Sequence, residues 1–174
     1  MIDNNSSLTG VERHLGQDDI IVSKTDPRGV ITYANQTFLD IAAYTEAEVL
    51  GRAHNLIRHP HMPGAVFRYL WQTIAAGQEV FAYVVNRCKN GDHYWVFAHV
   101  TPTFSKDGTI LGYHSNRRSP RREAVGRISK VYQSILEEER RHANPKQAAA
   151  AGLEFLVKTI KATGGSYEDF IFGL

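Results

Sequence analysis

The chain has 174 residues, of which 43% are hydrophobic and 22% charged, as expected for one soluble globular domain with some accessory structure. Its formal net charge of +2 is too balanced to indicate nucleic-acid binding. A single cysteine excludes an internal disulfide, and no run of 18 apolar residues is present to insert into a membrane, so we expect a cytoplasmic protein.

The first predicted structure is a β-hairpin that follows a polar N-terminal stretch. Residues 1–18 are expected to form an arm or a short cap helix. Two β-branched runs then flank the tetrapeptide DPRG at 26–29. Proline presets the first dihedral angle of a turn and glycine accepts positive φ, so this tetrapeptide predicts a hairpin. Asn35 ends the second strand and can cap the helix that follows.

Short helices are predicted between this hairpin and residue 77. Apolar residues recur at helical spacing in 36–44, and Thr45 with Glu48 forms a capping-box signature for a second helix. Prolines prevent one continuous helix through the next segment. Pro63 can nevertheless begin a third helix, because the first helical turn needs no amide donor at that position.

From residue 79 the apolar pattern changes to a period of two, which predicts strands. Two long strands are joined by Asn-Gly at 90–91, a strong hairpin signal, and a third strand follows the turn at 106–108. Two sets of hairpin strands with helices between them, and no β-α-β alternation, predict an α+β fold. We expect a five-stranded antiparallel sheet with short helices on one face.

The register of the long hairpin decides which side chains face inward. A three-residue loop with a glycine bulge pairs Asn86 with Tyr94, and we favour this loop over the plain two-residue turn. Both side chains then face the helices. Trp95 and Phe97 lie on the outer face, which is too apolar to be left to solvent. We therefore expect the helices after residue 121, or a second subunit, to cover it.

The C-terminal third is predicted to be helical. An apolar stripe within residues 121–143 indicates an amphipathic helix with a charged opposite face. A break at Asn144-Pro145 precedes a second apolar stripe, so residues 144–174 are read as a helical extension. The central domain is thus expected to span residues 19–120.

The segment HNLIRHPHMP at 54–63 combines three histidines with an arginine. His54, His59 and His61 are spaced five and two residues apart, with no cysteine or carboxylate among them. Zinc motifs use tighter pairs of ligands, so we predict no metal site. Arg58 suits a phosphate or a developing negative charge, although it can also be a solvated charge.

Asn86 is the most informative polar residue, because it interrupts an apolar strand face. A buried amide without partners costs about 1–3 kcal/mol, so protein, water or a ligand must satisfy it. Two other candidates have structural alternatives. Asn35 can be a helix cap only, and Trp71 on an apolar helix face can be a core residue.

The order of these elements resembles that of a PAS sensor domain. The segments TDPRGVITYAN and NRCKNGDHYWV carry the likeness, which covers residues 19–119. GRAHNLIRHPHMP together with KNGDHYW makes it most similar to the flavin-binding PAS module of bacterial aerotaxis receptors. The resemblance implies a PAS fold that binds FAD non-covalently, here as a free-standing redox sensor rather than an enzyme.

The resemblance also implies which residues bind the cofactor. Asparagine amides suit the imide edge of a flavin, histidines can donate hydrogen bonds, and a tryptophan offers a stacking surface. The expected cofactor-binding residues are Asn35, His54, Asn55, Arg58, His59, Trp71, Asn86 and Tyr94.

Other readings remain open at this stage. PAS domains of other subgroups bind haem through one histidine, for which His54 or His59 would serve. A PAS module without a cofactor would act only in protein interactions. Light-driven cysteine chemistry is not expected, because Cys88 lies on a strand and NLIRH stands where photosensors have NCRFL. Expected partners are a second copy of the chain, through the helices or outer sheet face, and a chemotaxis receptor or signalling kinase.

Overall fold

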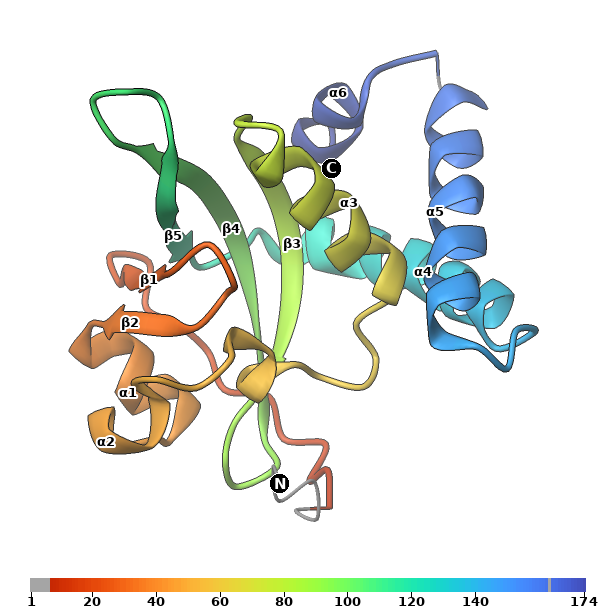
Figure 1. The fold of residues 1–174 in the computed structure, drawn as a ribbon. Helices are drawn as coiled ribbons and strands as arrows, with labels where there is room; N and C mark the ends of the chain where they lie inside the picture. Colours follow the sequence, from red (N-terminus) through yellow and green to blue (C-terminus); the bar gives the residue numbers. More distant parts are fainter. Residues whose placement is uncertain (1–6, 163) are drawn as a thin grey trace.

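The computed structural model describes residues 7–162 and 164–174 (Figure 1). Its centre is a five-stranded antiparallel sheet in the order β2-β1-β5-β4-β3, which confirms the predicted α+β fold. The strands are β1 (Ile21–Thr25), β2 (Ile31–Ala34), β3 (Val80–Arg87), β4 (His93–Phe104) and β5 (Ile110–Arg118). The helices are α1 (Gln36–Ala42), α2 (Glu46–Val49), the 3₁₀ helix η1 (His54–Ile57), α3 (Gly64–Ala75), α4 (Arg122–Glu139), α5 (Pro145–Ala162) and α6 (Tyr167–Phe172).

Local signals place the elements between β2 and β3. The Asn35 side chain accepts a hydrogen bond from the Phe38 amide and begins α1. The capping box of Thr45 and Glu48 begins α2, and α3 starts directly after Pro63. In Figure 1, α3 crosses in front of the sheet while α4 passes behind it. The short helices therefore lie on one face, as predicted.

The β3–β4 hairpin has the bulged register that the sequence favoured. Asn86 pairs with Tyr94, and Gly91 adopts a φ of 93° in the loop. Positive φ is accessible to glycine at little cost, which is why this residue closes the loop. The register turns Val84, Asn86 and Ala98 toward η1 and α3, and it turns Trp95 to the opposite face, toward α4.

The C-terminal helices cover the outer face of the sheet. This was one of the two expected covers, the other being a second subunit. Tyr132 of α4 stacks on Trp95 with ring centroids 6.2 Å apart, and its hydroxyl donates to the Tyr83 carbonyl at 2.6 Å. From α6, Phe172 contacts Phe97 edge-to-face at 6.1 Å. Burying this apolar face stabilises the domain.

The N-terminal arm runs along the end of the β3–β4 hairpin. Residues 7–20 contain no helix, so within the described part of the chain the alternative of a short cap helix is wrong. Residues 1–6 of the predicted arm lie outside the described residues. Glu12 pairs with His93 in a parallel bridge, and Arg122 donates two hydrogen bonds to the Glu12 carboxylate. The arm thereby ties the hairpin to the start of α4.

A second tie joins α4 to α3. The Glu139 carboxylate at the end of α4 accepts hydrogen bonds from the amides of Gly64 and Ala65 at 3.1 and 2.7 Å. Gly152 of α5 packs so closely that a Cβ there would lie 2.7 Å from the same carboxylate. Across residues 7–162 and 164–174, no helix is both long and apolar enough to cross a membrane.

Candidate functional site

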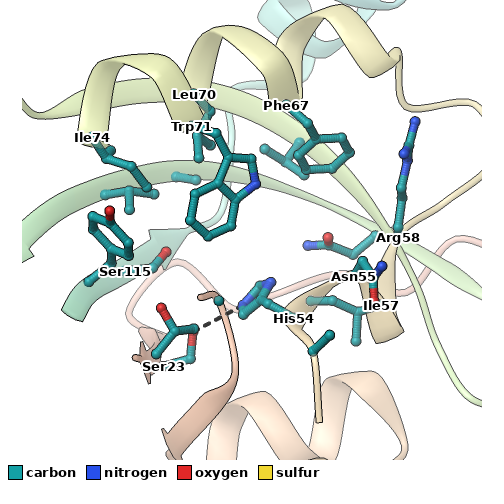
Figure 2. A pocket seen from close by; sticks show the side chains of 18 of the residues that line it. Ser23, His54, Asn55, Ile57, Arg58, Phe67, Leu70, Trp71, Ile74 and Ser115 are labelled. Carbon is teal, nitrogen blue, oxygen red and sulfur yellow. Dashed lines mark hydrogen bonds between the residues drawn. The ribbon is translucent and has the colours of Figure 1, made fainter. Parts of the chain in front are cut away.

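A cavity of about 440 Å³ lies between the inner sheet face, η1 and α3. Figure 2 shows Phe67, Trp71 and Ile74 reaching from α3 toward His54 and Ile57 of η1. Strands β1, β3, β4 and β5 supply the opposite wall. Its size and its mostly apolar walls with a few polar groups are those of a small-molecule site.

The charges around the cavity have one sign. Among the described residues that line it, four are arginines and none is acidic. Arg28 is paired at 3.0 Å with Asp26, which lies outside the lining. The other three arginines are Arg58, Arg68 and Arg117. A cavity lined by cations alone favours an anionic ligand.

Arg117 is a candidate site residue that our sequence reasoning missed. It is only 3% exposed, and its Nη2 donates to Ser23 Oγ at 2.5 Å and to His54 Nε2 at 2.8 Å. Its Nη1 is buried without a hydrogen-bond partner among the described residues. Burial lowers the pKa of Arg117 to about 10, so the side chain remains a cation at pH 7. A buried cation without an anion is costly, and Arg117 Nη1 is free to donate to an acceptor within the cavity.

A weak signal for Arg117 was present in the sequence. On β5 the side chains of Tyr113, Ser115 and Arg117 alternate toward the cavity. An arginine at an inward position of an alternating strand is unusual, because charged side chains rarely face a core without a partner. Ser115 adds a second signal in the structure, since its hydroxyl is also buried without a partner in the described chain.

His54 is held in its neutral form. The interaction with Ser23 at 3.2 Å, drawn as a dashed line in Figure 2, and the hydrogen bond from Arg117 both reach Nε2. Because Nε2 accepts from a cation, the ring proton is assigned to Nδ1. Burial and the charge of Arg117 lower the pKa of His54 to about 3.

This pKa makes the protein sensitive to acid. Since the pKa of His54 is lower when folded than the ordinary value of 6.5, its contribution is complete above pH 6.5 and declines as pH falls. Each pH unit below 6.5 is expected to lower the free energy of unfolding by about 1.4 kcal/mol. His54→Gln should therefore reduce the loss of stability between pH 6.5 and 5, as measured by urea unfolding. An unchanged pH dependence would contradict the assignment of His54 as neutral in the folded protein.

Three more predicted residues meet at the cavity wall. Asn86 is 4% exposed, and its side chain forms no hydrogen bond within the described part of the chain. Its backbone bridges to Arg58, whose guanidinium lies 5.0 Å from the Phe67 ring centroid. Asn55 and Arg58 both line the cavity with exposed side chains. The asparagine amides are therefore available to a ligand as paired donors and acceptors.

Trp71 forms the outer wall of the cavity. It is 37% exposed, and its ring meets Tyr113 edge-to-face at 5.5 Å. A Cβ at Gly29 would lie 2.8 Å from the indole, so the ring also closes over the β1–β2 turn. The alternative that Trp71 is a core residue is wrong, because the helix face that carries it opens onto the cavity rather than onto packed side chains.

Asn35, His59 and Tyr94 do not line the cavity. The Asn35 amide caps α1 and also donates to the Ile20 carbonyl at 2.8 Å, so its capping role is confirmed. His59 is 5% exposed and packs against His93, with ring centroids 5.5 Å apart. Tyr94 is fully buried on the inner sheet face. The predicted cofactor contacts of these three residues therefore lack support from the cavity geometry.

Cys88 is unsuited to adduct chemistry at this site. Its thiol is buried away from the cavity and donates to the Ile41 carbonyl at 3.1 Å. Burial raises its pKa to about 11, so the thiolate is scarce at pH 7.

Comparison with known proteins identifies relatives of this architecture. A family model described as the PAS fold matches residues 31–117. The aerotaxis receptor of Escherichia coli is 40% identical over 121 residues, which are 70% of this chain and 24% of the receptor. The chain therefore spans about a quarter of the length of this curated relative.

Solved structures show the same fold at lower sequence identity. A light-oxygen-voltage domain studied with a flavin analogue aligns with a TM-score of 0.57 and 20% identity, covering 68% of this chain and 88% of that chain. The light-state structure of the blue-light photoreceptor Aureochrome1 LOV aligns with a TM-score of 0.56 and 18% identity. That match covers 70% of this chain and 93% of that chain.

Proposed function

The chain belongs to the PAS family, and from this premise we propose that it binds FAD non-covalently in the cavity and signals the redox state of the flavin. The observation that carries the proposal is Arg117, a buried cation without a carboxylate partner at the base of a cavity of about 440 Å³. The similarity to the aerotaxis receptor and to light-oxygen-voltage domains supports a flavin as the ligand.

The residues present fit an isoalloxazine ring. A flavin needs a largely apolar slot and polar groups at its carbonyl and imide edge. Ile57, Leu70 and Val84 provide apolar walls. Asn86 offers a buried amide, and Ser115 Oγ and Arg117 Nη1 are buried polar atoms without partners among the described residues.

Arg117 and His54 are the proposed redox-sensitive pair. A bound flavin supplies electron-transfer chemistry and gains negative charge when it is reduced. In a cavity of low dielectric, such a charge would attract the Arg117 guanidinium strongly. The ligand and His54 Nε2, which already accepts a hydrogen bond from Arg117, would then compete for the guanidinium. Negative charge nearby would also favour protonation of His54.

The proposed signal leaves the cavity through strands and α3. Hydrogen bonds from Tyr132 to the Tyr83 carbonyl and from Tyr167 to the Phe81 carbonyl tie α4 and α6 to β3. Glu139 ties α4 to the start of α3. A differential binding of about 1–3 kcal/mol between two conformations is enough for a signal. We propose α4 as the output or dimerisation element, acting on a chemotaxis receptor or signalling kinase in the cytoplasm.

The flavin proposal is better supported than the two alternatives. A haem would need a histidine nitrogen that faces the cavity, but His54 Nε2 is held by Arg117 and His59 does not line the cavity. A PAS module without a ligand would leave the Arg117 and Ser115 polar atoms unpaired. Each unsatisfied buried polar group costs about 1–3 kcal/mol.

The absorption spectrum of the purified protein tests the proposal. We expect a yellow protein with the spectrum of an oxidised flavin, whose released cofactor is identified as FAD by chromatography after denaturation. A flavin-free preparation should recover the spectrum when FAD is added. A colourless protein that takes up no flavin under these conditions would contradict the proposal.

Asn86→Ala is expected to weaken flavin binding without unfolding the protein. The substitution removes a buried amide that we assign to the ligand, so the dissociation constant should rise about tenfold. Fluorescence titration measures the constant, and circular dichroism checks the fold. Asn116→Ala is the matched control, because Asn116 is on β5, which β4 separates from β3, and is absent from the cavity wall. Equal affinities for Asn86→Ala and the control would contradict the assignment.

A further inference from the structure

A second hollow, of about 510 Å³, lies on the surface between α3 and α5. Arg68 and Gln72 line it from α3, while α5 contributes an apolar strip that includes Leu153 and Val157. Val157 is 38% exposed although it is a large apolar side chain. We call this hollow the α3–α5 groove.

The α3–α5 groove is rich in free cations. Lys158 and Lys161 line it together with Arg68, whereas Glu154 is the only acid among its described lining residues. All four of these side chains are exposed. None of the three cations forms an ion pair within the described part of the chain, so their positive charge remains available to a ligand. Charge of this sign beside an apolar strip suits a nucleotide, which joins a phosphate to a planar base.

Arg68 connects the groove to the cavity. It lines the groove and also the cavity that contains Asn86 and Arg117. A path from the cavity across Arg68 into the groove therefore meets a mostly apolar cavity, then a guanidinium, then an apolar strip flanked by lysines. The same order of chemistry is found in a flavin dinucleotide, whose ring is joined to adenosine through a pyrophosphate.

We propose that the α3–α5 groove binds the adenosine monophosphate half of FAD, so that α5 makes this protein select FAD over FMN. Arg68 contacts the pyrophosphate, Lys158 and Lys161 supply further positive charge, and the adenine packs on the strip formed by Leu153 and Val157. This inference rests on the function proposed above and assigns a ligand subsite to a helix outside the sheet domain.

Binding constants for FAD and FMN, measured on the same flavin-free protein, test the inference. We expect the full chain to bind FAD about tenfold more tightly than FMN. Lys158→Glu and Lys161→Glu should each weaken FAD binding about fivefold while leaving FMN binding unchanged. Glu154→Gln should act in the opposite direction, tightening FAD binding about twofold. Lys146→Glu is the matched control, because it reverses the same charge on α5 outside the groove.

Three results would overturn the inference, and they do so in two different ways. Equal affinities for FAD and FMN in the wild type, or groove variants that bind FAD like the Lys146→Glu control, would remove the groove from the ligand site and leave the flavin cavity intact. A wild type that binds neither FAD nor FMN would overturn the proposed function, and the inference with it. FMN binding by each variant also shows that the cavity remains folded.

Discussion

Replacing Arg117 by methionine is expected to weaken flavin binding about a hundredfold and, at the same time, to stabilise the flavin-free protein by about 1–2 kcal/mol. The two effects have opposite signs because one cation causes both. Without a ligand, Arg117 is a buried charge that contacts Ser23 and His54 but no carboxylate. Methionine fills a similar volume and removes the cost of desolvating the charge. With a ligand, the same change removes the cation that we expect to face the flavin.

Urea unfolding of the flavin-free protein and fluorescence titration with FAD measure these two effects separately. Arg118→Met is the matched control, because the next residue on β5 is exposed and is absent from the cavity wall. It should change neither quantity appreciably. If Arg117→Met lowers the stability of the flavin-free protein and leaves FAD affinity unchanged, Arg117 is a structural residue and the flavin assignment loses its main support.

Removing the Glu139 carboxylate is expected to lower the free energy of unfolding by about 2–3 kcal/mol. In Glu139→Ala the amides of Gly64 and Ala65 lose the acceptor that begins α3. Hydrogen bonds to a charged acceptor contribute more than neutral ones, and these two also join α4 to α3. Because α3 carries Trp71, we expect flavin binding to weaken several-fold as well.

Glu138→Ala provides the control for this prediction. Glu138 pairs with Arg141 at 2.8 Å on the surface, and such exposed pairs are worth less than about 1 kcal/mol. Thermal unfolding of both variants, with and without FAD, measures the difference. If the two variants lose the same stability, the contact between α4 and α3 is not a specific tie and α4 would need another route to the cavity.

Short-range signals account for the parts of the fold that sequence reasoning predicted. The caps at Asn35 and at Thr45 with Glu48 act over three residues. The bulged loop around Gly91 sets the β3–β4 register through local backbone geometry. These interactions join residues that are close in the sequence, so their patterns can be recognised before the tertiary structure is known.

The composition of the cavity depends on contacts between distant residues. Arg117 lies 63 positions from His54 and 94 positions from Ser23, and the three meet only because β5 pairs with β1. The sequence marks Arg117 as an inward position on a strand but does not show which side chains surround it. For the same reason, the sequence could not show which histidines of the segment 54–63 line the cavity and which do not. His54 turns into the cavity, whereas His59 turns toward His93.

By itself the sequence determined the order of the elements, the antiparallel sheet and the apolar outer face that needs a cover. Each of these follows from periodicity, turn chemistry and the cost of exposing apolar surface, which act locally. Only the tertiary structure decided that Arg117 lies buried without a carboxylate, that Glu139 caps α3, and that α5 forms a cationic groove beside the cavity. These depend on how strands and helices are brought together across the sheet, and the energy of a charge depends on all the groups that surround it.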